Sequence, residues 1–162
     1  MPKPKAFVSI QFDDKQYYKP KFLKKYPFSF EIPKYSEFEL IDNHLNLKFK
    51  KYKAKLHISY FYLENDLKKH TENSRRLAFK HTDKANSISE IIYRNDERNV
   101  YGVKFDFDGS TATSTQFFLT DSTNHFFRGA LYFNTHKSDS LNIVEEYLKT
   151  DVVRIIETFC WK

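Results

Sequence analysis

The chain has 162 residues, enough for one domain with a single substantial core. Aromatic residues make up 18% of it, with 17 Phe and 11 Tyr against only 3 Gly, a composition that favours half-buried strands over a helical bundle and excludes a disordered chain. The net charge is +6, and residues 1–59 carry the whole excess, because their 13 Lys and 6 acidic residues give +7 while residues 60–162 give −1.

Alternating apolar residues predict several strands in the first part of the chain, over residues 6–12, 28–32, 45–49 and 56–62. Pro27 and Pro33 flank the second of these, which favours an edge position because proline donates no hydrogen bond to a neighbouring strand. The last two are expected to be neighbours, since only a short lysine-rich segment separates them.

The apolar spacing becomes helical after Glu64. Small residues let a helix lie close to a sheet, and they form a narrow stripe on one face of the predicted helix. The helix is expected to end between His81 and Ala85. The stripe consists of Leu67, Thr71, Ser74, Ala78, His81, Ala85 and Ile88.

Strands resume with a predicted hairpin of residues 88–94 and 100–107. Asp108-Gly109 is a strong turn signal, and strands over residues 111–120 and 124–134 complete a meander. A final helix is expected to begin in the Ser138-Asp139-Ser140 cluster, whose side chains are good N-caps. Its core-facing stripe consists of Leu141, Val144, Leu148, Val152, Ile155 and Phe159.

This order of elements predicts an α+β domain, an antiparallel sheet of about six strands flanked by two main helices. It is similar to that of the Mog1/PsbP-like α+β fold, a similarity that says little about function. We expect one domain over residues 6–162, preceded by a short extended tether at residues 1–5. No apolar run is long enough to span a membrane.

The excess charge in the first third is all lysine, a solvated point charge that suits anionic surfaces without reading bases. Two interpretations stay open, a solubilising face on edge strands or attraction to anionic lipid. Nucleic acid is not an expected partner, because arginine-rich and Gly-rich aromatic motifs are missing.

Arg128 lies between aromatic residues within the strand of residues 124–134. Phe127, Leu131 and Phe133 are expected on one face of that strand, and Phe126, Arg128, Ala130 and Tyr132 on the other. An arginine there needs a carboxylate, a carbonyl or water. It is either a structural ion pair or cation–π contact, with Asp121 and Asp151 as possible partners, or a recognition residue in a groove.

No residue is predicted to be catalytic, cofactor-binding or metal-ligating. The six histidines lack helical or strand metal-pair spacing, and the nucleophile elbow and the glycine-rich phosphate motifs are absent. Cys160 is the only cysteine, so no intramolecular disulfide forms, and a buried structural thiol is the favoured interpretation. The segment with Arg75, Arg76 and His81 is either a solvated cationic face or a docking face for an acidic partner.

Several stretches resemble the GldD family of gliding motility lipoproteins of the Bacteroidota, and together they cover essentially the whole chain. They are YPFSFEIPKYS (26–36), SRRLAFKHTDKA (74–85), NVYG (99–102), FFLTDSTNHFFRGALYF (117–133) and DVVRIIETFCWK (151–162). Arg128 and Tyr132 lie in the fourth stretch, and Asp151 and Arg154 lie in the fifth. The family's lipid-modified cysteine has no counterpart here, so the membrane anchor is implied by the resemblance alone.

The resemblance implies a non-enzymatic protein, lipid-anchored on the periplasmic side of the envelope and required for gliding motility and type IX protein secretion. Its expected partners are other envelope proteins of that machinery, whose assembly or stability it would support. The resemblance supplies no catalytic residues and no cofactor. An alternative is a module that binds a small ligand or glycan in an aromatic groove around Phe126, Arg128 and Tyr132, and a third possibility is an envelope hydrolase.

Overall fold

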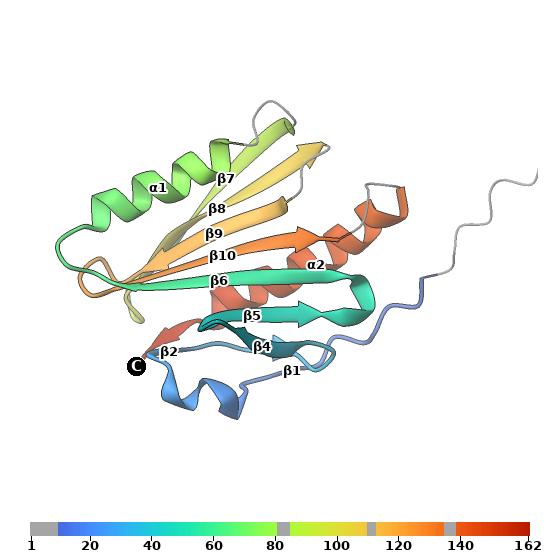
Figure 1. Ribbon diagram of the computed structural model, residues 1–162, viewed down its shortest axis with the longest axis horizontal. Helices are drawn as coiled ribbons and strands as arrows, with labels where there is room; N and C mark the ends of the chain where they lie inside the picture. Colours follow the sequence, from blue (N-terminus) through green and yellow to red (C-terminus); the bar gives the residue numbers. More distant parts are fainter. Residues whose placement is uncertain (1–9, 81–84, 110–112, 135–138) are drawn as a thin grey trace, which may run out of the picture.

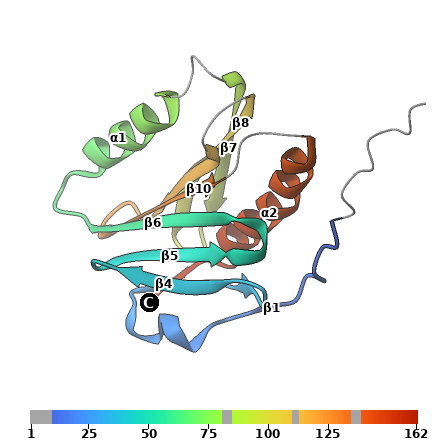
Figure 2. The same ribbon diagram turned by 45° about the vertical axis from the view of Figure 1, so that its right-hand side comes forward.

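The computed structural model describes residues 10–80, 85–109, 113–134 and 139–162. Seven strands form one antiparallel sheet in the spatial order β4-β5-β6-β10-β9-β8-β7. Two helices, α1 (Leu67–Phe79) and α2 (Asp139–Thr158), lie on opposite faces of this sheet (Figure 1 and Figure 2). The protein is therefore an α+β domain with an antiparallel sheet and two main helices, as the order of predicted elements indicates.

The chain first forms one half of the sheet, crosses to the opposite edge through α1, and then forms the other half strand by strand back toward the first. The first part consists of β4 (Glu37–Ile41), β5 (His44–Phe49) and β6 (Ala54–Tyr62). Helix α1 then leads to the far edge, and the meander comes back through β7 (Ala85–Asn95), β8 (Val100–Gly109), β9 (Thr113–Thr120) and β10 (His125–Phe133). Because β10 pairs with β6, the two parts join into one sheet.

Strand β4 lies outside the predicted strands and brings their number to seven. Its alternation is brief, and Leu40 and Ile41 at its end are exposed, so it does not resemble a half-buried strand. The sequence signal for β4 that was missed lies in the turn that follows it. Asp42 and Asn43 have φ angles of 48° and 65°, as a two-residue hairpin turn to β5 requires.

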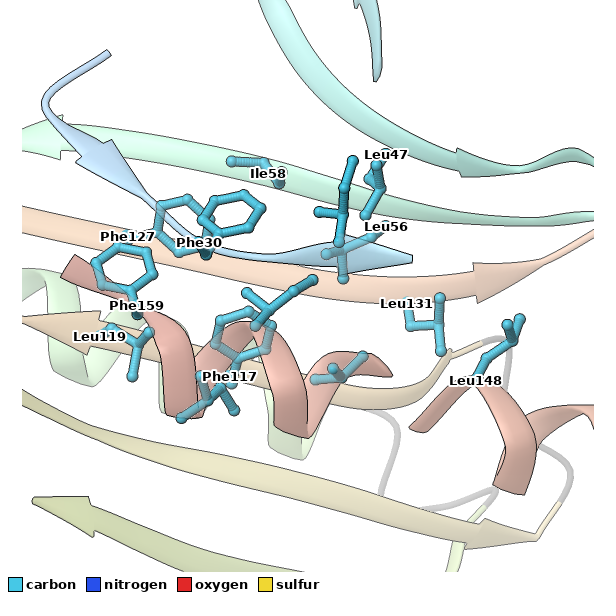
Figure 3. Close-up of a cluster of buried hydrophobic side chains, with 14 of the residues drawn as sticks. Phe30, Leu47, Leu56, Ile58, Phe117, Leu119, Phe127, Leu131, Leu148 and Phe159 are labelled. Atoms are coloured by element: carbon cyan, nitrogen blue, oxygen red, sulfur yellow. The ribbon is translucent and has the colours of Figure 1, made fainter. Parts of the chain in front are cut away.

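Side-chain alternation divides the core between the two faces of the sheet. Phe117, Phe127 and Leu131 point toward α2, whereas Phe118 and Phe126 point toward α1. The cluster on the α2 side is the larger one, and Figure 3 labels ten of its buried side chains. They come from the sheet, from α2 and the residue just after it, and from residues 10–36 before β4, which we call the N-terminal segment. Each fully buried phenylalanine contributes about 1.5–3 kcal/mol, so this cluster dominates the stability of the fold.

The predicted strand over residues 28–32 is not an edge of the main sheet. It is divided into β2 (Phe28–Ser29), which pairs with β11 (Cys160–Trp161), and β3 (Ile32–Pro33), which pairs with β1 (Tyr17–Tyr18). Its alternation has another cause, because Phe28, Phe30 and Ile32 are all buried in the cluster on the α2 side. Of the predicted strand over residues 6–12, residues 6–9 lie outside the described part and residues 10–12 are not in a strand.

Both helices end earlier than their apolar stripes suggest. Helix α1 ends at Phe79, and Ala85 and Ile88 of its stripe belong to β7. Ser74 and Ala78, the small residues in its centre, are buried as expected. Helix α2 begins at Asp139, in the predicted cluster, but ends at Thr158, so Phe159 packs on the core from a non-helical position. A stripe of apolar residues records burial and does not by itself locate a helix end.

Two short 3-10 helices complete the N-terminal part, η1 (Lys21–Lys25) and η2 (Lys50–Tyr52). Helix η2 forms the connection between β5 and β6. These two strands are neighbours, as predicted, and Lys53 closes the turn with a left-handed φ of 53°.

Candidate functional site

Arg128 lies on the α1 face of the sheet, in the middle of β10. The strand has the predicted facing, since Phe127, Leu131 and Phe133 belong to the cluster on the α2 side and Phe126 to the cluster on the α1 side. Arg128 is opposite Ser59 of β6 and Phe118 of β9. Strands β6 and β9 therefore lie on either side of Arg128, which is half-buried.

The hydrogen-bond partner of Arg128 is neutral. Its Nη2 donates to Oε1 of Gln116 at 2.5 Å, and no carboxylate of the described residues forms an ion pair with it. Burial lowers the pKa of Arg128, while the neighbouring Tyr132 acts in the opposite direction. The Nε2 atom of Gln116 is itself buried without a hydrogen-bond partner. Two adjacent donor groups therefore lack an anionic acceptor, and such a pair is suited to receive a carboxylate or another anion.

Tyr132 is next to Arg128 on the same face. Its ring meets the His57 ring edge-on, with centroids 5.1 Å apart. Burial lowers the pKa of His57, and the charge of Lys55 lowers it further. Phe126, by contrast, is 1% exposed and lies beneath α1, where it stacks on His70. Of the three side chains expected to form an aromatic groove, Phe126 is closed off by the helix.

Asp121 is not a partner of Arg128. It caps the turn between β9 and β10, where its Oδ1 accepts the backbone N–H groups of Thr123, Asn124 and His125 at 3.1, 2.8 and 2.8 Å. Burial alone would raise the pKa of Asp121, but these hydrogen bonds outweigh it and the pKa lies below its usual value. The carboxylate organises the turn, in which Ser122 has a positive φ of 71°.

Asp151 lies on the other side of the sheet, where three side chains donate hydrogen bonds to its carboxylate. Its side chain is 0% exposed. Oδ1 accepts from Lys15 Nζ at 2.8 Å and from the Tyr17 hydroxyl at 2.6 Å, and Oδ2 accepts from the Tyr35 hydroxyl. The expected pairing with Arg128 is therefore wrong, because residues from the N-terminal segment surround this carboxylate instead.

Aromatic rings enclose this contact, which we call the Asp151 clamp (Lys15, Tyr17, Tyr35 and Asp151). The Lys15 ammonium lies 3.3 Å from the ring centroid of Tyr147 and donates to the Tyr147 carbonyl at 2.9 Å. Burial lowers the pKa of Lys15, an effect that its bond to Asp151 opposes. Burial and the carboxylate both raise the pKa values of Tyr17 and Tyr35, so their hydroxyls stay protonated and act as donors.

The clamp fastens Lys15, Tyr17 and Tyr35 to α2. A second contact, between Asp13, Tyr52 and Tyr147, reinforces it, and Tyr147 lies one helical turn before Asp151. Tyr52 donates to Asp13 Oδ2 at 2.7 Å and accepts from the Asp13 N–H at 3.0 Å, while the Tyr147 hydroxyl donates to the Asp13 carbonyl. Both carboxylates are thus occupied by donors, and the arrangement is that of a structural fastening. Sequence reasoning missed Lys15, Tyr17 and Tyr35, because their partners are more than a hundred residues away.

The remaining predicted residues lie apart from one another. Arg75 on α1 binds Glu90 of β7 at 2.6 Å, and Arg76 donates to Asn73 at 2.5 Å. Arg154 on α2 donates to Glu31 at 2.9 Å and stacks over the Tyr17 ring at 4.8 Å, so it borders the Asp151 clamp. His81 lies outside the described residues. The seven predicted residues that the structure describes therefore do not form one site.

Hollows lined by described residues border both helices. One, of about 630 Å³, lies between α2 and strands β7 and β8, and its lining includes Lys104, which pairs with Asp106 at 3.0 Å. Another, of about 820 Å³, follows the flank of α1 beside Phe61 and includes Lys69 and Arg76. Neither brings a histidine beside a nucleophile.

Across the described residues, no three side chains of the His, Cys, Asp and Glu types come close enough to hold a metal ion together. In the same part of the chain, neither helix has the length and apolar content needed to cross a membrane.

The chain matches the profile of a known family. The profile of the family described as gliding motility lipoprotein GldD matches residues 1–161, which is nearly the full length. A search of curated proteins found no match. The matching family is named for motility and for a lipid anchor and not for an enzymatic activity.

Proposed function

The chain belongs to the GldD family of gliding motility lipoproteins, and from this membership we propose that it is a non-enzymatic envelope protein that supports assembly or stability of the machinery for gliding and type IX secretion. In this proposal the lipid anchor precedes the described residues and holds the domain on the periplasmic side of a membrane. The partners are other envelope proteins of the same machinery.

The observation that carries this proposal is the Asp151 clamp. A lipoprotein is held at its N-terminal side, so any pull between membrane and domain passes through the first described residues. Lys15 and Tyr17 attach these residues to a carboxylate that is 0% exposed in the middle of α2. The carboxylate is 0% exposed and the Lys15 side chain 27% exposed, so removal of one partner should cost less than the about 3–5 kcal/mol of a fully buried ion pair. The clamp would transmit load from the tether to the core without local unfolding.

The experiment compares Asp151→Asn with Asp14→Asn in the complete lipoprotein, expressed in place of the wild type. Asp14 is exposed in the same segment and therefore controls for the loss of a carboxylate. We expect Asp151→Asn to reduce single-cell gliding and secretion of cargo proteins, with the protein still present in the membrane fraction. Asp14→Asn should behave as the wild type.

Partner capture tests the assembly role directly. Tagged, anchored protein is purified in mild detergent, and the recovered proteins are identified by mass spectrometry. Repeated recovery of motility or secretion components supports the proposal. Purifications that consistently recover none of them would contradict it, whatever the gliding phenotype.

Arg128 favours a second candidate function, binding of a small acidic ligand or glycan on the α1 face of the sheet. The support is its neutral partner Gln116, whose own Nε2 lacks an acceptor. Tyr132 and His57 offer an aromatic border, whereas Phe126 is buried. Chemical-shift mapping with uronic-acid and N-acetylated oligosaccharides tests this function. Chemical-shift changes that are confined to β9 and β10 and vanish in Arg128→Gln support this function. The absence of any change at millimolar ligand would contradict it.

A further inference from the structure

Strand β7 forms one edge of the main sheet and leaves apolar side chains in the open. It is the last strand of the sheet and pairs with β8 alone among the described strands (Figure 1). Ile92 is 79% exposed and Ile91 is 40% exposed. Most soluble proteins cover, charge or bulge such an edge, because its free N–H and C=O groups pair readily with another strand. The bulge recorded in β7 lies at Ala85/Ser87, so residues 88–95 stay regular.

The free edge carries one residue of each charge on the same face as Ile92. Side chains alternate along a strand, which places Glu90, Ile92 and Arg94 on one face and Ile91 and Tyr93 on the other. The Glu90 and Arg94 side chains are 37% and 73% exposed. Opposite charges placed symmetrically about an exposed apolar residue make the strand complementary to itself.

Self-pairing in antiparallel fashion has a two-fold axis, and opposed side chains must point to the same face. The two-fold axis therefore lies midway between one residue and the same residue of the other copy, and we say that it passes through that residue. When it passes through Ile92, Glu90 of each copy lies opposite Arg94 of the other, and this happens twice. Ile92 then meets its own copy, and Ile91 meets Tyr93 on the other face. The register thus combines apolar contact at its centre with two ion pairs around it.

Neighbouring registers lack this match. An axis through Glu90 or through Arg94 puts like charges opposite each other. An axis through Ile91 leaves both charges opposite isoleucines, and one through Tyr93 brings Glu90 opposite Asp96. Because like charges directly opposite are destabilising, the strand selects the register centred on Ile92.

We propose that two copies of this chain associate edge to edge through β7, in the register centred on Ile92, to form one continuous antiparallel sheet. The existing bonds of Glu90 to Arg75 at 2.6 Å and of Arg94 Nε to Asp96 at 3.1 Å are compatible, since a carboxylate accepts several donors and a guanidinium has five N–H groups. Helices α1 and α2 pack on the two faces of the sheet, and the exposure of Ile91 and Ile92 shows that the edge between them is accessible. One strand edge buries less area than a standard interface, so the dimer is expected to be weak, in the micromolar range or above.

Sedimentation equilibrium of the 162-residue chain measures the association. The wild type should dimerise with a measurable dissociation constant. Glu90→Arg and Arg94→Glu each place two like pairs at the interface and should weaken dimerisation at least roughly tenfold. The decisive arm is an equimolar mixture of these two variants, in which every opposed pair is again complementary. The mixture should dimerise about as tightly as the wild type, whereas each variant alone should dimerise at least roughly tenfold more weakly.

Matched controls carry the same charge changes on α1. Glu72→Arg and Lys68→Glu alter residues whose side chains are 67% and 88% exposed and lie away from β7. Both should dimerise as the wild type does, whereas Ile92→Lys should abolish association. Circular dichroism and thermal melting confirm that each variant is folded.

The proposal is overturned if the wild type stays monomeric to about 1 mM, a limit below which a specific weak dimer would be detected. It is equally overturned if a dimer forms but is unaffected by Ile92→Lys, or if the mixed variants remain monomeric. The latter two results would place the interface or the register elsewhere.

Discussion

At the scale of single residues, the contrast between Arg128 and Asp151 decides how the candidate residues are interpreted. Both are charged groups within the fold. Asp151 is surrounded by three donors on the α2 side, whereas Arg128 has a neutral partner and a lowered pKa caused by burial. A half-buried charge without an opposite charge is costly, and we therefore propose that Arg128 serves recognition more than stability.

Replacement of Arg128 by glutamine should hardly change stability. The amide removes the desolvated charge and is still able to bond to Gln116, so the free energy of unfolding should change by less than about 1 kcal/mol. Lys104→Gln is the matched control, because Lys104 is a buried cation that has a carboxylate partner, Asp106, at 3.0 Å. The control should lose about 2 kcal/mol. Urea denaturation measures both. A larger loss for Arg128→Gln than for Lys104→Gln would make Arg128 a structural residue.

The turn carboxylate Asp121 should contribute to acid sensitivity. Its pKa in the folded protein lies below the usual value, so the stability it adds is present above the unfolded pKa, about 3.9, and is lost as pH falls through the folded pKa. Asp121→Asn should therefore cost about 1 kcal/mol at pH 7. The difference from wild type should shrink below about pH 4. Denaturation curves at several pH values measure this, and a difference that stays constant down to pH 2 would contradict it.

At the scale of elements, short strands that pair across long sequence distances close the α2 side of the molecule. Strand β11 at the end of the chain pairs with β2, and the Trp161 indole N–H donates to the Asn99 carbonyl at 3.1 Å. The Trp161 ring packs on Phe159 and His125, with centroid distances of 4.6 and 5.0 Å. The last residues therefore connect the N-terminal segment, the β7–β8 turn and the start of β10.

Trp161→Ala should lower the free energy of unfolding by about 2 kcal/mol, less than for a fully buried tryptophan because the ring is half-buried. Circular dichroism follows the unfolding, since the substitution removes the single tryptophan of the chain. Tyr62→Ala is the control, because Tyr62 is 62% exposed and should cost less than about 0.5 kcal/mol. Equal losses for the two variants would show that β11 does not hold the segment in place.

At the scale of the whole molecule, the sheet separates two environments. The N-terminal segment, α2 and β11 cover one face and build the larger core, and α1 covers part of the other face. The lysine excess lies in residues 1–59, the part of the chain nearest the proposed anchor. A positive region beside a lipid anchor would strengthen attachment to an anionic membrane surface.

The 162-residue chain should bind vesicles that contain anionic lipid at low salt and release them at about 0.5 M salt, where screening removes the attraction. Neutral vesicles should bind none. Lys50→Gln combined with Lys53→Gln should weaken binding roughly tenfold to thirtyfold, at about 1 kcal/mol per lysine. The same loss of charge at Lys68 and Lys80, exposed residues at the two ends of α1, is the control and should leave binding unchanged. If both double substitutions weakened vesicle binding equally, binding would depend on net charge alone and not on the position of the lysines.

Local patterns were sufficient for most elements of the fold. The meander of β7 to β10, the neighbouring β5 and β6, the two helices and the facing of Arg128 follow from alternation, turn residues and helical spacing, which depend on residues close in sequence. The same patterns misplaced residues 28–32, because burial of Phe28, Phe30 and Ile32 alternates as it would in a sheet strand although these residues pair elsewhere.

The sequence by itself determined the α+β class, the family and the presence of an arginine in need of a partner. Only the tertiary structure decided which partner each charge has. Asp151 bonds to Lys15 across more than a hundred residues, and Arg128 bonds to Gln116 of the adjacent strand. Such pairings depend on strand register and on the position of α2 over the sheet, and a register shift of one residue would turn each side chain to the other face. Residue types reveal that a charge must be paired, whereas geometry selects the group that pairs with it.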